Sequence, residues 1–396
     1  MEGREGVEVV MLEKAIRGSQ TYWGWLIFLL LLIGVGTGNF IYQFLEGLKI
    51  TGMGRDVSWG LYIAQFTYLV GVAASGVMVV LPYYLHNYKA FGRITILGEF
   101  MAIAAVTMCI LFLWVDLGQP IRVLNVLLYP RPNSIIFWDM VVLTGYLILN
   151  VLIGWNVLSA ERKGIHYPKW VTPLIYLSIP WAFSIHTVTA FLYQGLPGRH
   201  FWLTAIMAAR FLASAFASGP ALLLIICFIV RRFTRFDPGK QQMRTLASIV
   251  TYAMILNVFF FLLEIFTAFY SQIPEHMVHF QFLFAGLEGH GRLVPWMWGA
   301  TVFAVLALIL LINPSTRRKE DTMLVGCASV VIATWIDKGL ALIIGGFTPN
   351  PFERVTDYWP TVPEVLIVLG VWATGFFILT VLFKIAASVK EEVAGY

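Results

Sequence analysis

Residues 59–76 read WGLYIAQFTYLVGVAASG, and residues 202–219, WLTAIMAARFLASAFASG, repeat them in outline. In both segments a tryptophan is followed, at the same separation, by Ala-Ser-Gly. With the apolar residues around it, each segment is long enough to cross a bilayer core, which takes about 20 apolar residues. The pair predicts membrane-spanning helices that belong to an internal repeat.

The whole chain has the composition of a polytopic membrane protein. Its residues are 59% hydrophobic and only 12% charged, whereas roughly a quarter of the residues in a soluble domain are charged. The apolar runs between polar breaks predict about ten spans. These are residues 22–42, 59–85, 95–115, 135–158, 172–194, 202–230, 245–271, 295–312, 322–346 and 363–386.

The loops predict the orientation of these spans. Lys and Arg accumulate on the cytoplasmic side of membrane proteins. Most of them lie in the termini and in the loops after the even-numbered spans, including the basic loop 231–244. We therefore expect a multi-pass protein of the cytoplasmic (inner) membrane with both termini in the cytoplasm. Residues 1–20 lack the short apolar region and cleavage site of a signal peptide.

Two further matches extend the repeat over four spans. Asp116 and Glu264 each end a similar apolar run, and Trp138 and Trp296 each open the following span. Four spans return the chain to its starting side, so the repeats would be parallel. The predicted fold is all-α, with two parallel four-helix bundles and peripheral first and last helices. The corresponding division is 1–58, 59–194, 195–346 and 347–396.

Charged and histidine side chains interrupt the predicted spans, although a charge in hydrocarbon costs a few kcal/mol or more. In the predicted topology they share the outer half of the membrane, which is typical of proton- or redox-linked membrane proteins. They are Asp116, Asp139, His186, Arg210, Glu264, Asp337 and Lys338.

The sequence excludes several kinds of cofactor site. The three cysteines are isolated in apolar runs, without a CxxC pair for an iron–sulfur cluster or a CxxCH motif for c-type haem. His186 and His86 lie at different depths, so we expect no b-type haem and no metal site. The basic residues are spread over loops, so the net charge of +5 does not predict nucleic-acid binding.

An acid, an amide and a base follow the end of the third span at three-residue spacing. They are Asp116, Gln119 and Arg122. On a continuing helical turn these groups would share a face. One interpretation is an ion pair that stabilises the membrane exit. The other is a hydrogen-bonding wall for the polar head of a ligand at the outer interface.

Several motifs resemble the membrane subunits of the polysulfide reductase or NrfD type, across nearly the whole chain. The motifs are Asp116-Leu-Gly-Gln-Pro120, Tyr129-Pro130, Trp138-Asp139, Trp59-Gly60 and the stretch from Tyr358 to Glu364. Gln119 stands where the family usually has Arg, and Arg122 follows. The length and span layout are most similar to the DsrP branch, the membrane subunit of the sulfite-reduction-associated DsrMKJOP complex.

This resemblance implies a menaquinone site in the first bundle near the outer face, with no haem, iron–sulfur cluster or other redox metal bound by this chain. It also implies an outer ferredoxin-like iron–sulfur subunit, a multihaem cytochrome c, a haem-b membrane subunit and a cytoplasmic iron–sulfur subunit as partners.

The residue types agree with a quinone site, because quinol oxidation needs hydrogen-bond donors to the carbonyls and groups that accept protons. Asp116 and Asp139 are the expected proton acceptors. An interfacial aromatic belt is the alternative for the tryptophans. The expected quinone-binding residues are Trp59, Tyr62, Gln65, Tyr68, Gln119, Arg122 and Trp138.

A polar path from this site toward the cytoplasm is a second hypothesis. Glu99 lies 17 positions before Asp116, or about 25 Å along a helix. Thr107 lies between them, and Tyr146 and Ser75 are candidates from neighbouring spans. His186 is either a hydrogen-bonded core residue or part of a proton relay.

The second bundle has its own charges. We expect Arg210 to pair with Glu264, and Asp337 with Lys338, either as structural ion pairs or as proton carriers. The outer loops 272–294 and 347–362 are the predicted docking surface. A secondary transporter is the alternative function, but transporter sites lie near the midplane on broken helices, and Pro220 has no counterpart at Val77.

Overall fold

The fold is a bundle of long helices with ten candidate membrane spans among the described residues. The computed structural model describes residues 11, 13–74, 76–85 and 89–394. The candidate residues Ser75 and His86 lie outside them. Since the spans follow the predicted ones closely, the predicted all-α polytopic class is confirmed.

Eight of these spans are single helices, and two are built from shorter pieces. The span helices and their pieces are α2 (Gln20–Glu46), α3 (Leu61–Ala74) with α4 (Val77–Tyr84), α5 (Thr95–Asp116), α7 (Ile135–Arg162), α8 (Val171–Gln194), α9 (Met207–Phe233), α10 (Lys240–Tyr270), α12 (Val294–Ile312), α14 (Glu320–Thr334) with η5 (Trp335–Ala341) and α15 (Leu342–Phe347), and α16 (Val362–Ala394).

Short helices occupy the connections. They are η1 (Leu48–Ile50), η2 (Lys89–Arg93), η3 (Pro120–Leu124), α6 (Asn125–Leu128), η4 (His200–Trp202), α11 (Pro274–Phe284) and α13 (Pro314–Arg317).

Burial separates the central helices from the lipid-facing ones. Every residue of α3 from Leu61 to Ala74 is buried, whereas α2 leaves apolar side chains such as Leu31 and Leu45 mostly exposed. In a bilayer, exposed apolar side chains face lipid and need no further cover. Helix α3 is therefore the centre of the molecule, and α2 is at its edge.

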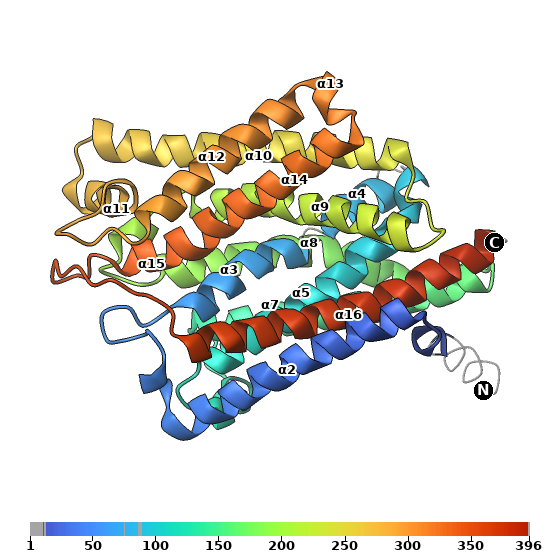
Figure 1. Ribbon diagram of the computed structural model, residues 1–396, viewed down its shortest axis with the longest axis horizontal. Coiled ribbons are helices and arrows are strands. Elements are labelled where there is room, and N and C mark those ends of the chain that lie inside the picture. The colour runs from blue at the N-terminus through green and yellow to red at the C-terminus, as the bar shows by residue number, and fades with distance from the viewer. Residues whose placement is uncertain (1–10, 12, 75, 86–88, 395–396) are drawn as a thin grey trace.

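Two groups of four spans pack around this centre (Figure 1). In the first group, α3 packs on α5, α5 on α7, and α7 on α8. In the second group, α9 packs on α10 and α14, and α12 packs on α14. Helix α3 also packs on α9 and η5, which joins the two groups.

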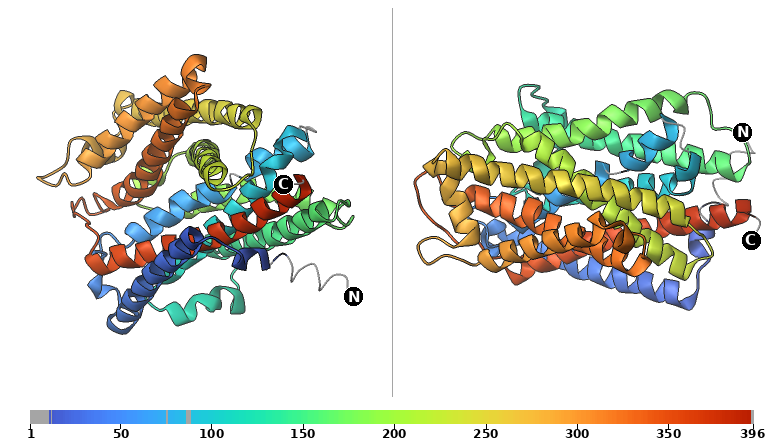
Figure 2. Two further views of the ribbon diagram at one scale, coloured as in Figure 1. Left: turned by 45° about the vertical axis from the view of Figure 1, so that its right-hand side comes forward. Right: turned by 90° about the horizontal axis from the view of Figure 1, so that it is seen from above.

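Helices α2 and α16 form a pair outside the first group (Figure 2). The pair packs mainly through α16 on α5. The beginning of α2 and the end of α16 lie at the same end of the molecule (Figure 1). We call this end the termini end, and the other, which carries α11 and α15, the loop end.

Candidate functional site

Helix α5 ends at Asp116, because the next residue, Leu117, is extended with φ −71° and ψ 126°. The predicted shared face of Asp116, Gln119 and Arg122 is therefore wrong, since Gln119 lies in a bend with φ −132° and ψ 76°, and Arg122 lies in the separate helix η3. Both side chains are exposed. Asp116 instead turns inward, and its Oδ1 is buried with no hydrogen-bond partner among the described residues.

A hydrogen-bonded chain passes beside Asp116. The hydroxyl of Tyr62, at the start of α3, donates to Gln43 Oε1 over 2.7 Å. Gln43 Nε2 in turn donates to the carbonyl of Val115 over 2.6 Å. Gln43 is a buried amide on α2 that the sequence analysis missed; a polar residue late in an otherwise apolar span was the available signal. The chain fixes the phenol of Tyr62 next to the end of α5.

Asp139 is the second buried carboxyl at the loop end, 3% exposed in the first turns of α7. Its Oδ1 accepts a 2.7 Å hydrogen bond from the hydroxyl of Thr189 on α8. Its neighbour Trp138 points elsewhere, being 45% exposed and donating to the carbonyl of Pro132 over 2.7 Å. The structure thus places Asp139 in the core and Trp138 at the surface.

An aromatic cluster lies where the two helix groups meet at the loop end. The indole rings of Trp59 and Trp202 stack with centroids 6.0 Å apart. Tyr193 packs edge-on to Trp59, with centroids 5.8 Å apart, and its hydroxyl lies 2.5 Å from that of Thr67. The two tryptophans that matched in the sequence repeat are therefore in direct contact.

Gln65 faces away from the Tyr62 chain, toward α16 and η5. Its Oε1 accepts hydrogen bonds from the indoles of Trp335, at 2.9 Å, and Trp372, at 3.0 Å. One turn further on, the hydroxyl of Tyr68 is buried and unpartnered within the described part of the chain. The amide of Gln65 is held in one orientation by groups from the last helix and the second group.

Glu99 lies near the other end of α5 and borders a cavity of about 860 Å³. Its Oε2 is buried, and no partner is found for it in the residues that the structure covers. The cavity lies at the termini end, where Lys390 pairs with Glu161 over 2.5 Å. The wall also carries the hydroxyl-bearing Tyr84 and Tyr167.

The other residues of the predicted polar path make their hydrogen bonds within their own helices. Tyr146 is buried, and its carbonyl accepts from Asn150 Nδ2 over 2.8 Å. Thr107 donates to the carbonyl of Ile103 in its own helix over 2.8 Å. His186 is fully buried on α8, and its ring approaches the backbone carbonyl of Ala182, one turn earlier in the same helix.

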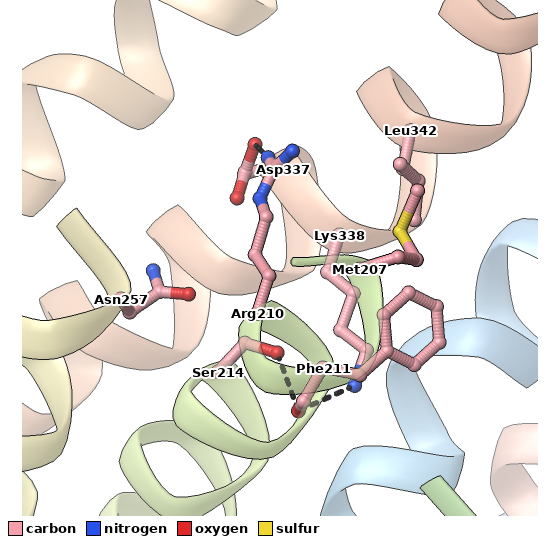
Figure 3. Close-up of a pocket in the computed structure, with 8 residues that line it drawn as sticks. All are labelled: Met207, Arg210, Phe211, Ser214, Asn257, Asp337, Lys338 and Leu342. Atoms are coloured by element: carbon pink, nitrogen blue, oxygen red, sulfur yellow. Dashed lines mark hydrogen bonds and ion pairs between the residues drawn. The ribbon is translucent and has the colours of Figure 1, made fainter. Parts of the chain in front are cut away.

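The second group carries a cluster of charges around Arg210 (Figure 3). Arg210 pairs with Glu264, as predicted, and its other terminal nitrogen lies 2.8 Å from Asp337 Oδ1. The predicted Asp337–Lys338 pair is wrong, because Asp337 is taken by Arg210. Lys338 instead donates to the carbonyl of Phe211 over 3.3 Å. The π-helical turn η5 carries both Asp337 and Lys338.

Glu364 is a buried carboxylate that the sequence analysis quoted only within a motif. It lies in the first turn of α16 and accepts from the backbone N–H groups of Gly52, at 3.0 Å, and Leu61, at 3.3 Å. Tyr358 also donates to it, and burial raises the pKa of this tyrosine above its usual range. Glu364 therefore ties the beginnings of α3 and α16 together.

Metal ligands do not converge in the part of the chain that the structure describes: no group of three His, Cys, Asp or Glu residues could hold an ion there. The polar groups at the loop end are instead carboxyls, phenols and amides. Such groups can donate hydrogen bonds to a ligand's carbonyls and accept protons from its hydroxyls.

Known proteins resemble the chain over most of its length. It is 26% identical to a Halobacterium salinarum protein provisionally named as a membrane subunit of dimethyl sulfoxide reductase, over 90% of this chain and 89% of that one. It is 23% identical to the Hdr-like menaquinol oxidoreductase integral membrane subunit of Archaeoglobus fulgidus, over 96% and 97%. It is 20% identical to the menaquinone reductase integral membrane subunit of Nitratidesulfovibrio vulgaris, over 86% and 85%.

The family described as polysulphide reductase, NrfD, matches residues 49–350. That range runs from η1 to the end of α15 and so includes both groups of four spans. With ten candidate spans and a match over most of its length, the chain is a multi-pass membrane protein that belongs to the polysulphide reductase NrfD family.

Proposed function

We propose that this chain is the quinone-interacting membrane subunit of a respiratory electron-transfer complex. It exchanges electrons between menaquinol, bound in the first helix group at the loop end, and an iron–sulfur partner subunit. The observation that carries the proposal is the buried Oδ1 of Asp116, which lies beside Tyr62 and has no hydrogen-bond partner among the residues that the structure describes. Two relatives named for menaquinol or menaquinone support it.

The chemistry of quinol oxidation explains the residue types. Oxidation of menaquinol to menaquinone breaks two O–H bonds and releases two electrons and two protons. Asp116 is placed to accept one proton, and Asp139, held by Thr189, to accept the other. The amide of Gln65 is the proposed donor to one quinone oxygen, and the phenol of Tyr62 donates to the other by exchanging its hydrogen bond to Gln43 for one to the quinone. Trp59 and Tyr68 line the ring slot.

The first repeat suits this task better than the second. The repeat alignment of Trp138 with Trp296 sets Asp139 against Met297, so the second group lacks the second acid. In the repeat, Asp116 matches Glu264, which forms an ion pair with Arg210. Of these repeat-related acids, the two that form no ion pair with any described residue, Asp116 and Asp139, therefore belong to the first group.

The proposal also covers the orientation of the chain in the membrane and its partner subunits. The loop end faces outward, and the termini lie in the cytoplasm. The loops 272–294 and 347–362 receive a ferredoxin-like iron–sulfur subunit. The resemblance to the DsrP branch supports a place in dissimilatory sulfur metabolism, with a multihaem cytochrome c, a haem-b subunit and a cytoplasmic iron–sulfur subunit in the complex.

Replacement of Asp116 tests the site. In the purified complex, Asp116→Asn should slow menaquinol oxidation by ~100-fold or more, the usual contribution of a positioned general base. Extracted quinone per complex should stay unchanged. Glu46→Gln is the matched control, because Glu46 is a half-exposed carboxylate at the same end, paired with Lys49. Equal rates in both variants would contradict the site, and substrate counterflow by the lone chain would favour a transporter.

Proton translocation is tested separately at the termini end. We propose that the cavity beside Glu99 admits protons from the cytoplasm toward the quinol site. Glu99→Gln in reconstituted complexes should lower the membrane potential formed per quinol oxidised and leave the oxidation rate unchanged. Glu161→Gln is the control, since Glu161 borders the same cavity but is paired with Lys390. An unchanged potential in Glu99→Gln would exclude this route.

A further inference from the structure

The cavity beside Glu99 at the termini end is large enough to hold a bound molecule. Its volume of about 860 Å³ falls among those of pockets that enclose small ligands, roughly 300–1,000 Å³. The described part of its wall comes from α4, η2, the beginning of α5, the end of α7, the loop after α9 and the end of α16. Both helix groups and the peripheral pair therefore meet around it.

Two buried polar atoms in this wall have no partner among the described residues. They are Oε2 of Glu99, a residue that is 3% exposed, and the hydroxyl oxygen of Tyr84. Lys390, a cation on the same wall, is bound instead to Glu161, at 2.5 Å, and to the carbonyl of Gly92, at 3.1 Å. Because buried polar groups without hydrogen bonds are costly, the cavity favours a ligand that donates to Glu99 and accepts from Tyr84.

Phenol rings lie in the same part of the wall. The rings of Tyr83 and Tyr84 pack edge to face with centroids 4.7 Å apart, and Tyr167 adds a third ring 6.5 Å from Tyr84. The charge of Glu99 acts on both Tyr83 and Tyr84, so the carboxyl and the rings belong to one site. Aromatic faces and carboxylates both attract organic ammonium groups. This part of the cavity therefore fits an ammonium group.

Two arginines of the wall provide the opposite charge. Arg93 and Arg235 are exposed, and in the described ranges neither takes part in an ion pair. Two acids of the wall accept from backbone N–H groups, Asp237 from Gly239 over 3.0 Å and Glu391 from Arg235 over 2.7 Å. A guanidinium binds phosphate through two parallel hydrogen bonds. The two arginine side chains therefore fit a phosphate group.

The mixed charge of the wall favours a ligand that carries both signs. Its described residues include three cations and four carboxyl groups, namely Arg93, Arg235, Lys390, Glu99, Glu161, Asp237 and Glu391. A simple anion would meet the carboxylates, and a simple cation would meet the arginines, and like charges repel. A zwitterion finds an opposite charge for each of its two groups.

Exposed apolar side chains form another part of the wall. Ile165, Tyr176 and Val393 line the cavity, and all three are exposed. In a bilayer, exposed apolar side chains face lipid, so an apolar chain attached to the ligand can leave the cavity along them. The ligand that fits the whole cavity is therefore an amphiphile with a zwitterionic head.

We propose that this cavity binds a phospholipid whose head is phosphoethanolamine. The ammonium donates hydrogen bonds to Glu99, and the phosphate accepts them from Arg93 and Arg235. The hydroxyl of Tyr84 is a further donor to the phosphate, and the acyl chains leave along the exposed apolar side chains. The proposal does not rest on the quinone function, and it leaves Glu99 beside a proton donor, as the proton route proposed above requires.

Lipid titrations of the purified, delipidated complex test the headgroup. Native mass spectrometry measures the dissociation constants of phosphatidylethanolamine, phosphatidylcholine and phosphatidylglycerol with identical acyl chains. Phosphatidylethanolamine should bind about tenfold tighter than phosphatidylcholine, because choline has no N–H group to donate to Glu99. It should also bind tighter than phosphatidylglycerol, which has no cation. Free phosphoethanolamine, without acyl chains, should bind more weakly than the lipid.

Variants of the wall assign the two charges of the head. Glu99→Gln should remove most of the preference for ethanolamine over choline. The double variant Arg93→Gln, Arg235→Gln should weaken both lipids alike, by ~10-fold or more. Arg232→Gln is the matched control, because Arg232 is an exposed arginine near the same loop but outside the described wall. The control should bind every lipid as the wild type does.

The wild type alone can overturn the proposal. Equal affinities for the ethanolamine and choline lipids would exclude recognition of the ammonium, and tighter binding of phosphatidylglycerol would indicate simple attraction of anions. Equally tight binding of free phosphoethanolamine would assign the cavity to a soluble ligand instead.

The variants provide a second way to overturn it. A loss in Arg232→Gln as large as in the double variant would mean that the basic surface as a whole binds lipid. Size-exclusion and thermal unfolding profiles establish that each variant is folded. Quinol oxidation is measured on the same wild-type sample, and its absence would contradict the proposed function while leaving the lipid preference intact.

Discussion

At the scale of single residues, Glu364 shows how one carboxylate can organise two helices. Its oxygens accept from backbone N–H groups at the beginning of α3 and in the loop after α2, and from Tyr358. Because Leu61 begins α3, its N–H is one of those that a helix start leaves open, and it is shared by the hydroxyl of Tyr358, at 2.7 Å, and the carboxylate, at 3.3 Å. A negative charge there is also favoured by the helix dipole.

Removing this carboxylate should destabilise the fold. Glu364→Ala leaves several buried donors without an acceptor, and we expect a loss of ~3–5 kcal/mol in the free energy of unfolding. Glu364→Gln keeps one acceptor oxygen and should lose less than half as much. Chemical unfolding in mild detergent, followed by tryptophan fluorescence, measures both; equal stability of the alanine variant and the wild type would exclude the role.

His279 gives α11 a pH dependence. Burial lowers the pKa of His279 to about 4, against about 6.5 in an unfolded chain, while its Nδ1 stays 2.7 Å from the carbonyl of Gly345. The folded state therefore binds fewer protons than the unfolded one between these two pH values. Stability is full above about pH 6.5 and falls as the pH drops toward about 4, by at most ~3 kcal/mol.

Hydrogen exchange in α11 measures this effect. Local opening should become more frequent as the pH is lowered through that window, after correction for the intrinsic exchange rate. His279→Gln, which keeps a donor but does not titrate, should remove the dependence. His166, an exposed histidine, provides the control as His166→Gln. A dependence that survives His279→Gln would assign the titration to another group.

Single residues also show what the sequence could predict. The Arg210–Glu264 pair was predicted, because two opposite charges at matching depth in neighbouring spans have few other partners in a membrane. The partner of Asp337 was not, since adjacent residues on a helix point in different directions. Gln43 was missed because its use depends on the carbonyl of Val115, which α5 brings to it only in the fold.

At the scale of helices, α2 and α16 approach each other through glycines. A Cβ added at Gly36 would lie 2.6 Å from the Cα of Gly370, and one added at Gly370 would lie 2.7 Å from the Cα of Gly36. Small residues allow such close contact between membrane helices. The indole of Trp25 adds a 3.2 Å hydrogen bond to Thr380 along the same pair.

Alanine at Gly36 should therefore force the two helices apart and destabilise their contact by ~1–3 kcal/mol. The same helix offers matched controls, because a Cβ at Gly34 or Gly38 meets nothing within 4 Å. Both control alanines should leave the melting temperature in detergent unchanged or raise it slightly. If all three variants melt alike, the crossing does not depend on Gly36.

Helix ends and irregular turns were the weak part of the sequence-based prediction. The ten spans follow from the length of the apolar runs, which a bilayer sets. The end of α5 at Asp116 matches the predicted span 95–115, but the extended backbone at Leu117 was not predicted, because Gly118 and Pro120 allow several backbone paths. The π-helical turn η5 was not predicted either, since it changes the hydrogen-bond register without a distinctive residue pattern. Those two features decide where Asp116 and Lys338 point.

At the scale of the whole molecule, contacts between repeat-related segments join the two groups. Trp59 and Trp202 match in the repeat and stack on each other, as equivalent residues near a two-fold axis do. Gln65 on α3 also contacts the second group, by accepting from Trp335, and the last helix α16, by accepting from Trp372. Through Gln65, the first group, the second group and the last helix share one acceptor oxygen.

This shared acceptor predicts coupling between distant parts of the chain. Gln65→Leu leaves the indole N–H groups of both Trp335 and Trp372 without an acceptor, and we expect a loss of ~2–4 kcal/mol in the free energy of unfolding. Trp335→Phe and Trp372→Phe each remove one donor and leave Gln65 one partner, so each should cost less. In a double-mutant cycle the two tryptophan changes should be non-additive by more than ~0.5 kcal/mol, because they act on one oxygen. Additive effects would mean that the two hydrogen bonds form independently, and that α16 and η5 are not coupled through α3.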